Sequence, residues 1–289
     1  MQKERSSICI LIPYFGNWPF WISLFLHGCR ANPTVNWIIY TDCDLPENCP
    51  KNVQIRHVTY QNYCCCISES LGIEFAPKSP YKLCDIKPAL GYIHSEEIKS
   101  YDFWGFGDLD LIYGDLRAYF SCHRLQSKDL FSTTGRRVSG HLCLMRNIEE
   151  MRTAFMRVEG WKQIFSSNQH VAFDEKHFSK IFLRHKNSPF FVRWIAAKFD
   201  SWLTRGEFNE AYVTPNAGIP WIDGTYDFPT EWYWKDGVVT NNLTGDREFP
   251  YFHFMIWKNK WSKSNTLSML DLNNMQDRVI VTESGITVV

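Results

Sequence analysis

The sequence predicts an α/β protein with a mixed, mainly parallel central sheet flanked by helices. An apolar strand over 8–14 is followed by a helical segment over 18–30, with Pro19 near its start, and then by a second strand over 36–44. A strand that is apolar at every position is buried on both faces, which is typical of parallel sheets covered by helices. Alternating strands and helices build such a sheet, and ligands bind beyond the carboxyl ends of its strands.

The next segments continue the alternation. A third strand is expected over 52–60, and a helix over 81–101, entered through Pro88, leads into the aromatic strand that begins the run 103–116. Segment 130–147 reads as a strand, a loop rich in Gly and Arg, and another strand. The remaining expected elements are a helix over 147–165, a helix begun by Asp174 and Glu175, a hairpin over 229–242 that turns at Asp236-Gly237, an aromatic strand and loop over 249–261, and a closing hairpin over 277–289.

This order of elements favours one core domain with an extension. We expect the domain over 1–262, with a nucleotide-binding half at about 1–120 and an acceptor half at about 121–262. Residues 263–289 are then a C-terminal tail with a small hairpin.

Composition excludes some classes of function and favours others. The 31 basic and 31 acidic residues cancel, and no basic cluster is dense enough to follow a nucleic-acid backbone. Aromatic residues make up 16% of the chain, and Trp and Tyr stack on sugar faces and line interfaces. The ten cysteines and the absence of a signal peptide indicate reduced thiols in the cytoplasm. The longest apolar stretch near the start is too short to span a membrane.

The most informative motif is Asp108-Leu109-Asp110, inside an otherwise apolar run. In extended backbone, residues two apart project to the same side, so both carboxylates can meet one cation. Hard oxygen ligands suit Mg²⁺ or Mn²⁺, and a cation relieves the repulsion between the two charges. The alternative is a solvated acidic turn. Asp115, past Gly114, is expected to cap the next helix instead.

Several segments, in this order, resemble glycosyltransferases of the GT-A fold that use nucleotide sugars, in particular bacterial enzymes of polysaccharide biosynthesis of the capsule and O-antigen type. The resemblance covers roughly residues 6–260 and depends on the order of the motifs. These motifs are ILIPYFGNW, IIYTDCD, GDLD, SGHLCLMRN and YFHFMIWKNKW.

The resemblance implies roles for the matching residues. Asp108 would lie near the ribose or the metal, and Asp110 would ligate the metal that holds the nucleotide diphosphate, with Leu109 between them. His253 is similar to a C-terminal histidine that completes the metal shell in several retaining members, and Lys258 would contact phosphate. Those members space the two residues differently and have glycine between them, where this chain has HFMIWK. The alternative for His253 is a packed histidine that makes one hydrogen bond.

Other positions carry weaker expectations. Asp174 and Glu175 are candidate carboxylates near the anomeric carbon, as a base for the acceptor hydroxyl or as an electrostatic partner, although acidic residues also favour a helix start for its dipole. The other candidates, each with ordinary packing, a turn or solvation as its alternative, are Pro13, Tyr14, Phe15 and Asp42 for uracil or ribose, Lys82 and Lys87 for phosphate, Ser139, Gly140 and His141 for close approach of a sugar, and Trp221, Trp232 and Trp234 for an acceptor platform.

Segment 188–205 mixes aromatic side chains with Arg193, Lys198 and Arg205. It fits an amphipathic helix that touches a membrane carrying a lipid-linked acceptor, and it fits equally a helix packed on the main sheet, which is the preferred interpretation.

The sequence therefore predicts a metal-dependent glycosyltransferase that moves a sugar, expected to come from a UDP-sugar, to a glycan or lipid-linked glycan hydroxyl. Retention and inversion both stay open, with a slight lean to retention from His253. One alternative is a sugar-phosphate nucleotidyltransferase, which should carry a Gly-rich loop with a basic residue after the first strand. The other is a non-catalytic carbohydrate-binding protein. The expected location is the cytoplasm, at the inner face of the membrane if the peripheral contact exists.

Overall fold

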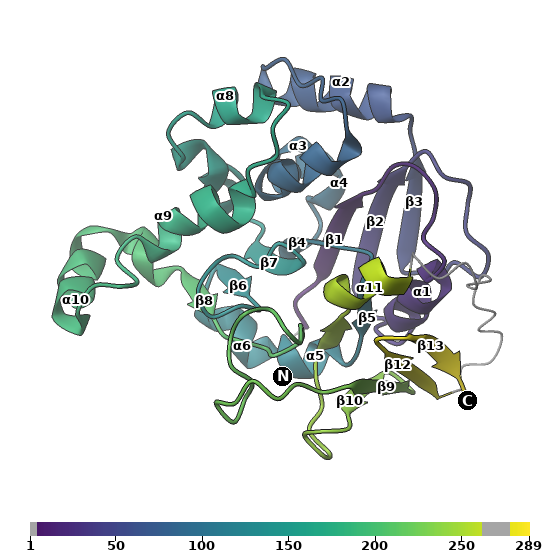
Figure 1. Cartoon of the computed structure of the whole chain (residues 1–289). Coiled ribbons are helices and arrows are strands. Elements are labelled where there is room, and N and C mark those ends of the chain that lie inside the picture. The colour runs from purple at the N-terminus through teal and green to yellow at the C-terminus, as the bar shows by residue number, and fades with distance from the viewer. Residues whose placement is uncertain (1–4, 262–277) are drawn as a thin grey trace.

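The computed structural model describes residues 5–261 and 278–289, and a seven-stranded sheet forms its centre (Figure 1). Its strands are β1 (Ile8–Pro13), β2 (Val35–Thr41), β3 (Val53–His57), β4 (Phe103–Gly107), β6 (Leu130–Ser132), β7 (Leu142–Arg146) and β8 (Gly206–Phe208). They are ordered β3-β2-β1-β4-β7-β6-β8, and four of the six neighbouring pairs are parallel. The predicted mixed, mainly parallel sheet is confirmed.

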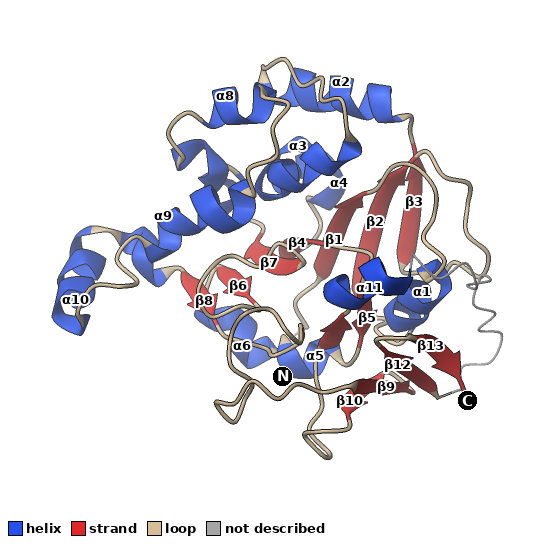
Figure 2. Ribbon diagram, in the orientation of Figure 1, coloured by secondary structure: helices blue, strands red, loops and turns tan. Residues whose placement is uncertain are grey.

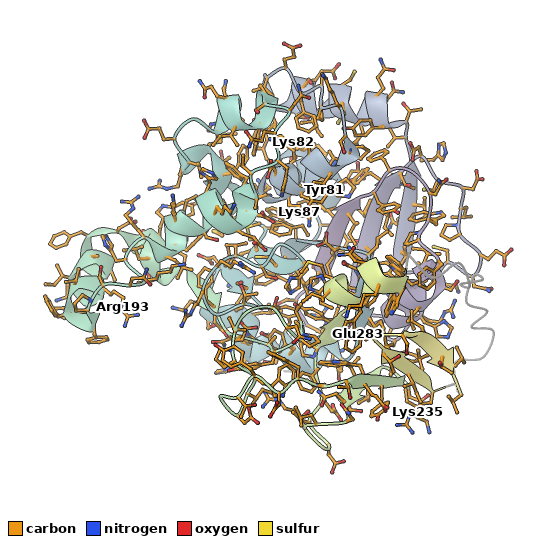
Figure 3. The ribbon with its side chains drawn as sticks, in the orientation of Figure 1. Tyr81, Lys82, Lys87, Arg193, Lys235 and Glu283 are labelled. Atoms are coloured by element: carbon orange, nitrogen blue, oxygen red, sulfur yellow. The ribbon has the colours of Figure 1, made fainter. Side chains whose placement is uncertain are left out.

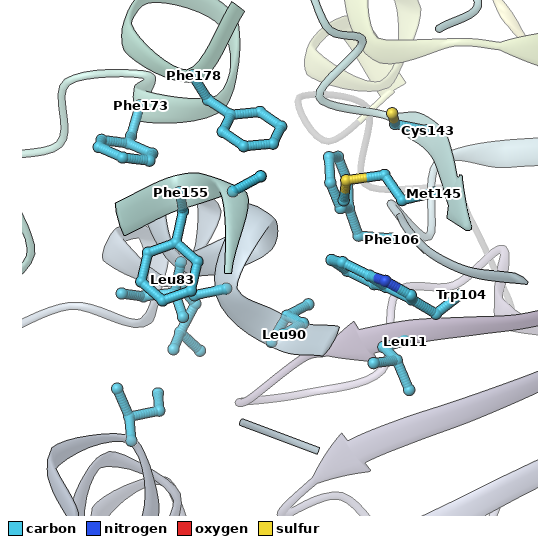
Figure 4. Packing of buried hydrophobic residues seen from close by; sticks show 14 of the residues in the cluster. Leu11, Leu83, Leu90, Trp104, Phe106, Cys143, Met145, Phe155, Phe173 and Phe178 are labelled. Atoms are coloured by element: carbon cyan, nitrogen blue, oxygen red, sulfur yellow. The ribbon is translucent and has the colours of Figure 1, made fainter. Parts of the chain in front are cut away.

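Helices cover both faces of this sheet, so its central strands are buried on both sides (Figure 2). Along β1, Cys9 and Leu11 point to one face, whereas Ile8, Ile10 and Ile12 point to the other. The first core joins Leu11 with Trp104 and Phe106 of β4 and with the helices beside them (Figure 4). This face is covered by α2 (Tyr60–Leu71), α3 (Leu90–Ile93), α4 (Ser95–Ile98), α7 (Glu149–Arg152), α8 (Trp161–Ser166) and α9 (Ser179–Leu183). The other face is covered by α1 (Ile22–Arg30), α5 (Leu116–Tyr119) and α6 (Cys122–Ser127).

The strand order creates a switch point between β1 and β4. Strand β1 pairs with β2 on one side and with β4 on the other, both in parallel. The register places Leu11 opposite Phe106, so the segments that follow Pro13 and Gly107 leave the sheet side by side. Open α/β sheets bind their ligands at such a point.

The C-terminal part forms a smaller layer below the sheet in Figure 1. Strand β5 (Leu111–Tyr113) pairs antiparallel with β11 (Tyr251–His253), and a four-stranded sheet has the order β10-β9-β12-β13. Its strands are β9 (Glu231–Lys235), β10 (Val238–Asn241), β12 (Val279–Thr282) and β13 (Gly285–Val288). Both predicted hairpins are present, and the positive φ angles of Asp236 and Gly237, 51° and 81°, match a type I′ turn. Because β9 pairs with β12, this sheet contains strands from before and after residue 262. The expected boundary between a domain over 1–262 and a tail over 263–289 stays a prediction.

Three expected elements differ from the structure. Segment 81–101 is a 3-10 helix over Pro80–Ala89 followed by α3 and α4, because Pro88, with no N–H, interrupts continuous α-helix. Segment 147–165 is divided into α7, a 3-10 turn over Ala154–Arg157 and α8, with Gly160 at φ 71° before α8. The expected loop after the strand at 249–261 is instead the helix α11 (Met255–Trp261).

The preferred interpretation of segment 188–205 is wrong. It forms α10 (Phe190–Phe199), which contains no buried residue and extends away from the sheet at the left of Figure 1, and a short 3-10 turn over Ser201–Thr204. Asp115 does cap α5, because its carboxylate accepts hydrogen bonds from the backbone N–H groups of Arg117 and Ala118. All ten cysteines are free thiols. Within the described ranges no helix has the length and apolar character needed to span a bilayer.

Candidate functional site

The paired aspartates follow β4 at the switch point, and backbone contacts hold the turn that carries them. The N–H of Asp108 donates to the carbonyl of His141 at 3.1 Å, and the Trp21 indole N–H donates to the carbonyl of Leu109 at 3.0 Å. The carbonyl of Asp110 accepts from the N–H of Phe254 at 3.2 Å. Three separate segments therefore fix the direction of the two carboxylates.

His253 comes to the same place because β11 pairs with β5. The register puts His253 opposite Leu111, the residue that follows Asp110. Asp108, Asp110 and His253 each offer one ligand atom, and these atoms all lie within 4.8 Å of one another. Two carboxylates and one imidazole at this separation suit a divalent cation.

Asp110 is buried and is held in its charged form. Its Oδ2 accepts a hydrogen bond from Nζ of Lys258 on α11 at 2.6 Å and lies 3.5 Å from Nε2 of His253. Burial alone would raise the pKa of Asp110, but His253 and Lys258 outweigh it and hold that pKa well below its usual range. Asp110 is therefore an anion at every pH at which the protein is expected to work.

Asp108 is more exposed, with 34% of its side chain accessible, and has its own lysine. Nζ of Lys87 donates to Oδ1 of Asp108 at 2.5 Å and to the carbonyl of Gly140 at 2.7 Å. Burial would lower the pKa of Lys87, yet the charge of Asp108 raises it above its ordinary value. The two aspartates are thus balanced by two buried or half-buried lysines from elements far apart in the chain.

The imidazole of His253 is oriented as a metal ligand would need to be. Its Nδ1 hydrogen-bonds Oγ1 of Thr214 at 2.9 Å, so Nε2 faces Asp110, and its ring stacks on His141 with centroids 4.2 Å apart. Burial, and then His253, lower the pKa of His141 well below its usual value, so His141 is neutral. Nε2 of His141 is buried without a hydrogen-bond partner among the described residues. Asp108, Asp110 and His253 therefore fit a cation, and Nε2 of His141 beside them can still form a hydrogen bond.

Asp174 and Glu175 lie next to this cluster, at the start of a π-helical turn over Asp174–Phe178. A Cβ added to Gly140 would lie 2.8 Å from Oδ2 of Asp174 and 3.3 Å from Oε1 of Glu175, so a larger residue at 140 would displace these carboxylates. Burial raises the pKa of Asp174 to about 7, although Lys87 opposes the shift. Glu175 is partly exposed, and its Oε2 lies 3.5 Å from Arg137. A carboxyl group that titrates near neutrality is suited to proton transfer.

The residues after β1 lie beside the aspartates but face different surroundings. The Tyr14 ring stacks on Trp18 with centroids 5.5 Å apart, and Oδ1 of Asp42 accepts from the N–H of Gly16 at 2.9 Å. Pro13 ends the strand. Phe15 is 8% exposed and packs in the core, which is the strand-end alternative.

Two groups of expected contacts are wrong. Lys82 is neither near solvent nor free for phosphate, because its Nζ donates to Asp85, to Ile164 O and to Gln169 O. The expected acceptor platform does not exist either, because its three tryptophans are buried in the C-terminal core. They are Trp221, Trp232 and Trp234, at 3%, 1% and 1% exposure.

Two residues of the site were not predicted. Thr214, which orients His253, lies in a segment without a motif, and no pattern in the sequence indicates it. Tyr81 is 64% exposed and lies within electrostatic range of Asp108, Lys87 and Lys258 (Figure 3). An aromatic residue just before Lys82 and Lys87 is its only signal in the sequence.

Comparison with known proteins gives a family and several distant structural similarities. A family model described as "Family of unknown function (DUF6625)" matches residues 10–287, and no curated protein matches significantly. The galactosyltransferase LgtC, solved with donor and acceptor sugar analogues, is 9% identical over 71% of this chain and 75% of its own, with a TM-score of 0.32. GlyE, a glycosyltransferase of Streptococcus pneumoniae TIGR4 in its apo form, is 13% identical over 69% of this chain and 50% of its own, with a TM-score of 0.33. Mouse xyloside xylosyltransferase 1 is 8% identical over 71% of this chain and 94% of its own, with a TM-score of 0.34.

Proposed function

The chain belongs to DUF6625, a family of unknown function, and from its site we propose that it is a metal-dependent glycosyltransferase. It moves a sugar from a nucleotide-diphosphate donor, with a UDP-sugar as the expected donor, to a hydroxyl of a glycan or a lipid-linked glycan. The observation that carries this proposal is the convergence of Asp108, Asp110 and His253 with Lys87 and Lys258 at the switch point of the sheet.

Asp108, Asp110 and His253 would hold Mn²⁺ or Mg²⁺ beside the donor. When bound, the cation would supply Lewis-acid stabilisation of the negative charge that grows on the departing diphosphate. The imidazole nitrogen in this set favours Mn²⁺, because Mg²⁺ prefers oxygen ligands.

The two lysines would act differently at the leaving group. Lys258 is 33% exposed at its side chain and bonds Asp110, so a diphosphate that approaches Asp110 also approaches this ammonium group. Lys87 is buried, and its contacts with Asp108 and Gly140 O fix its position. We expect Lys258 to contact phosphate directly and Lys87 to keep Asp108 oriented.

Asp174 and Glu175 would stand beside the transferred sugar. A carboxylate there would stabilise the positive charge that develops at the anomeric carbon, or accept the proton of the acceptor hydroxyl. We lean to a retaining reaction because of His253; in an inverting reaction, Asp174 or Glu175 would be the base. Tyr14 and Asp42, at the end of β1 and after β2, remain candidates for contact with uracil and ribose.

Titration calorimetry with UDP, with and without Mn²⁺, tests the site. We expect UDP to bind only with Mn²⁺, and Asp110→Asn to remove the binding, because Asp110 is a proposed metal ligand. Asp246→Asn, which removes the same charge from an exposed position, is the control and should bind as the unchanged protein does. UDP binding that is the same with and without Mn²⁺, and the same in Asp110→Asn, would contradict the proposed site.

A scan of nucleotide sugars for Mn²⁺-dependent hydrolysis tests the reaction class. Hydrolysis of one or more UDP-sugars is expected, since water replaces a missing acceptor in a transferase site. Pyrophosphate release from UTP and a sugar phosphate would indicate a nucleotidyltransferase instead. The segment after β1, residues 14–21, argues against that alternative because it holds a single glycine and no Lys or Arg.

A further inference from the structure

Helix α10 presents large apolar side chains to solvent, which is unusual for a helix of a folded domain. It has no buried residue, and it extends away from the main sheet in Figures 1 and 2. The exposed apolar residues are Phe190 (73%), Phe191 (62%), Trp194 (53%), Ile195 (46%) and Phe199 (88%).

These side chains form one continuous surface. Phe191, Ile195 and Phe199 are four residues apart in the helix and therefore lie on one face, with Trp194 beside them. The ammonium group of Lys198 lies 3.5 Å from the centre of the Trp194 ring, so a cation sits directly within the apolar face.

The charged side chains of α10 and of the segment before it are basic. Residues 182–199 contain Arg184, Lys186, Arg193 and Lys198 but no Asp or Glu, and Asp200 is the first acidic residue after them, whereas the whole chain has 31 basic and 31 acidic residues. Arg193 lies on α10, at the side of the molecule where this helix extends away from the sheet (Figure 3). The helix and the segment before it are thus both aromatic and basic.

A groove lies beside the same helix. It has a volume of about 620 Å³, and Arg136, Lys186 and Arg193 line it together with Phe190 and Trp194. The carbonyl of Arg136 accepts a hydrogen bond from Nζ of Lys186 at 2.8 Å, which ties the groove to the body of the domain. Basic groups next to aromatic rings match the phosphate and the upper acyl region of an anionic lipid.

We propose that α10 and the basic segment before it dock the protein on the surface of a bilayer that contains anionic phospholipid. The aromatic face enters the boundary between headgroups and acyl chains, and Arg184, Lys186, Arg193 and Lys198 contact the phosphates. The helix lies in the surface rather than crossing it, because its ten residues are about half of what a membrane span requires.

Co-sedimentation with lipid vesicles tests this proposal. The full chain is mixed with vesicles of phosphatidylcholine alone or of phosphatidylcholine and phosphatidylglycerol in equal parts. We expect binding to the anionic vesicles only, and weaker binding as salt is added. Arg193→Glu/Lys198→Glu should weaken it at least about twentyfold, since each basic residue near an anionic surface contributes roughly a factor of five. Phe191→Ser/Trp194→Ser should abolish it.

Matched controls separate docking from general effects on the protein. Lys235→Glu and Tyr226→Ser alter an exposed lysine and an exposed aromatic residue elsewhere, and both should bind vesicles as the unchanged protein does. All variants should unfold at the same temperature, because α10 contributes no buried side chain to the core. The proposal is overturned if the unchanged protein does not bind anionic vesicles, or if it binds neutral vesicles equally well. It is also overturned if size-exclusion chromatography shows a dimer that Phe191→Ser/Trp194→Ser converts to a monomer.

Discussion

Asp174→Asn should make the protein more stable while it removes the proposed carboxylate. The unfolded carboxyl group ionises with a pKa of 3.8, whereas the folded one keeps its proton up to about 7. Between these values the folded state binds more protons, so ionisation lowers the free energy of unfolding as pH rises. The resulting loss in the free energy of unfolding is close to zero below pH 4, roughly 2 kcal/mol at pH 5 and roughly 4 kcal/mol at pH 8. Asparagine avoids it, and its side-chain oxygen still accepts from the N–H of Glu175.

The measurement is urea unfolding of the metal-free protein, followed by tryptophan fluorescence at three pH values. We expect Asp174→Asn to exceed the unchanged protein by roughly 4 kcal/mol at pH 8 and to equal it near pH 4. Asp246→Asn, at an exposed position, should show no such difference. Equal or lower stability of Asp174→Asn at pH 8 would refute the view that Asp174 is a buried acid with a raised pKa. Loss of donor hydrolysis in the same variant would agree with its proposed role.

Three further outcomes are expected. Lys82→Met leaves Asp85 buried without its lysine, with only backbone N–H donors and His170 beside it, so the free energy of unfolding in urea should fall by about 3–5 kcal/mol. Lys82→Met/Asp85→Asn should recover part of that loss, and no recovery would show that the charge left behind is not the cause. Thr214→Val removes the hydroxyl that orients the candidate metal-ligating imidazole, so Mn²⁺ affinity in calorimetry should fall about 10–100-fold; an unchanged affinity would exclude this orienting role. Gly140→Ala places a methyl group 2.8 Å from Oδ2 of Asp174, so kcat for donor hydrolysis should fall about 100-fold while UDP still binds. An unchanged kcat would show that Asp174 takes no part in the reaction.

Short-range patterns in the sequence were sufficient for much of the fold. The apolar strand at the start, the Asp236-Gly237 turn and the Asp115 cap each depend on a few adjacent residues, and all are present. The pair Asp108 and Asp110 was found in the same way, because residues two apart in extended chain share a side.

The remaining features depend on contacts between distant residues. Lys82 is expected at the surface from its type alone, and only the carbonyls of Ile164 and Gln169 explain why it is buried. Segment 188–205 has the composition of a helix on a sheet, since aromatic and basic residues suit a buried face as well as a membrane surface. Periodicity gives the apolar face of a helix but not what covers it.

The two halves of the candidate site are made at different times during synthesis. Asp110 and Lys258 are 148 positions apart, so the ribosome completes the strand that carries the aspartates long before it makes α11. Domains generally fold as units, and contacts at such separation form late. The carboxylate of Asp110 would therefore stay hydrated in the growing chain and become buried only when β11 joins β5. A nascent protein arrested before residue 253 would therefore have no complete cation site.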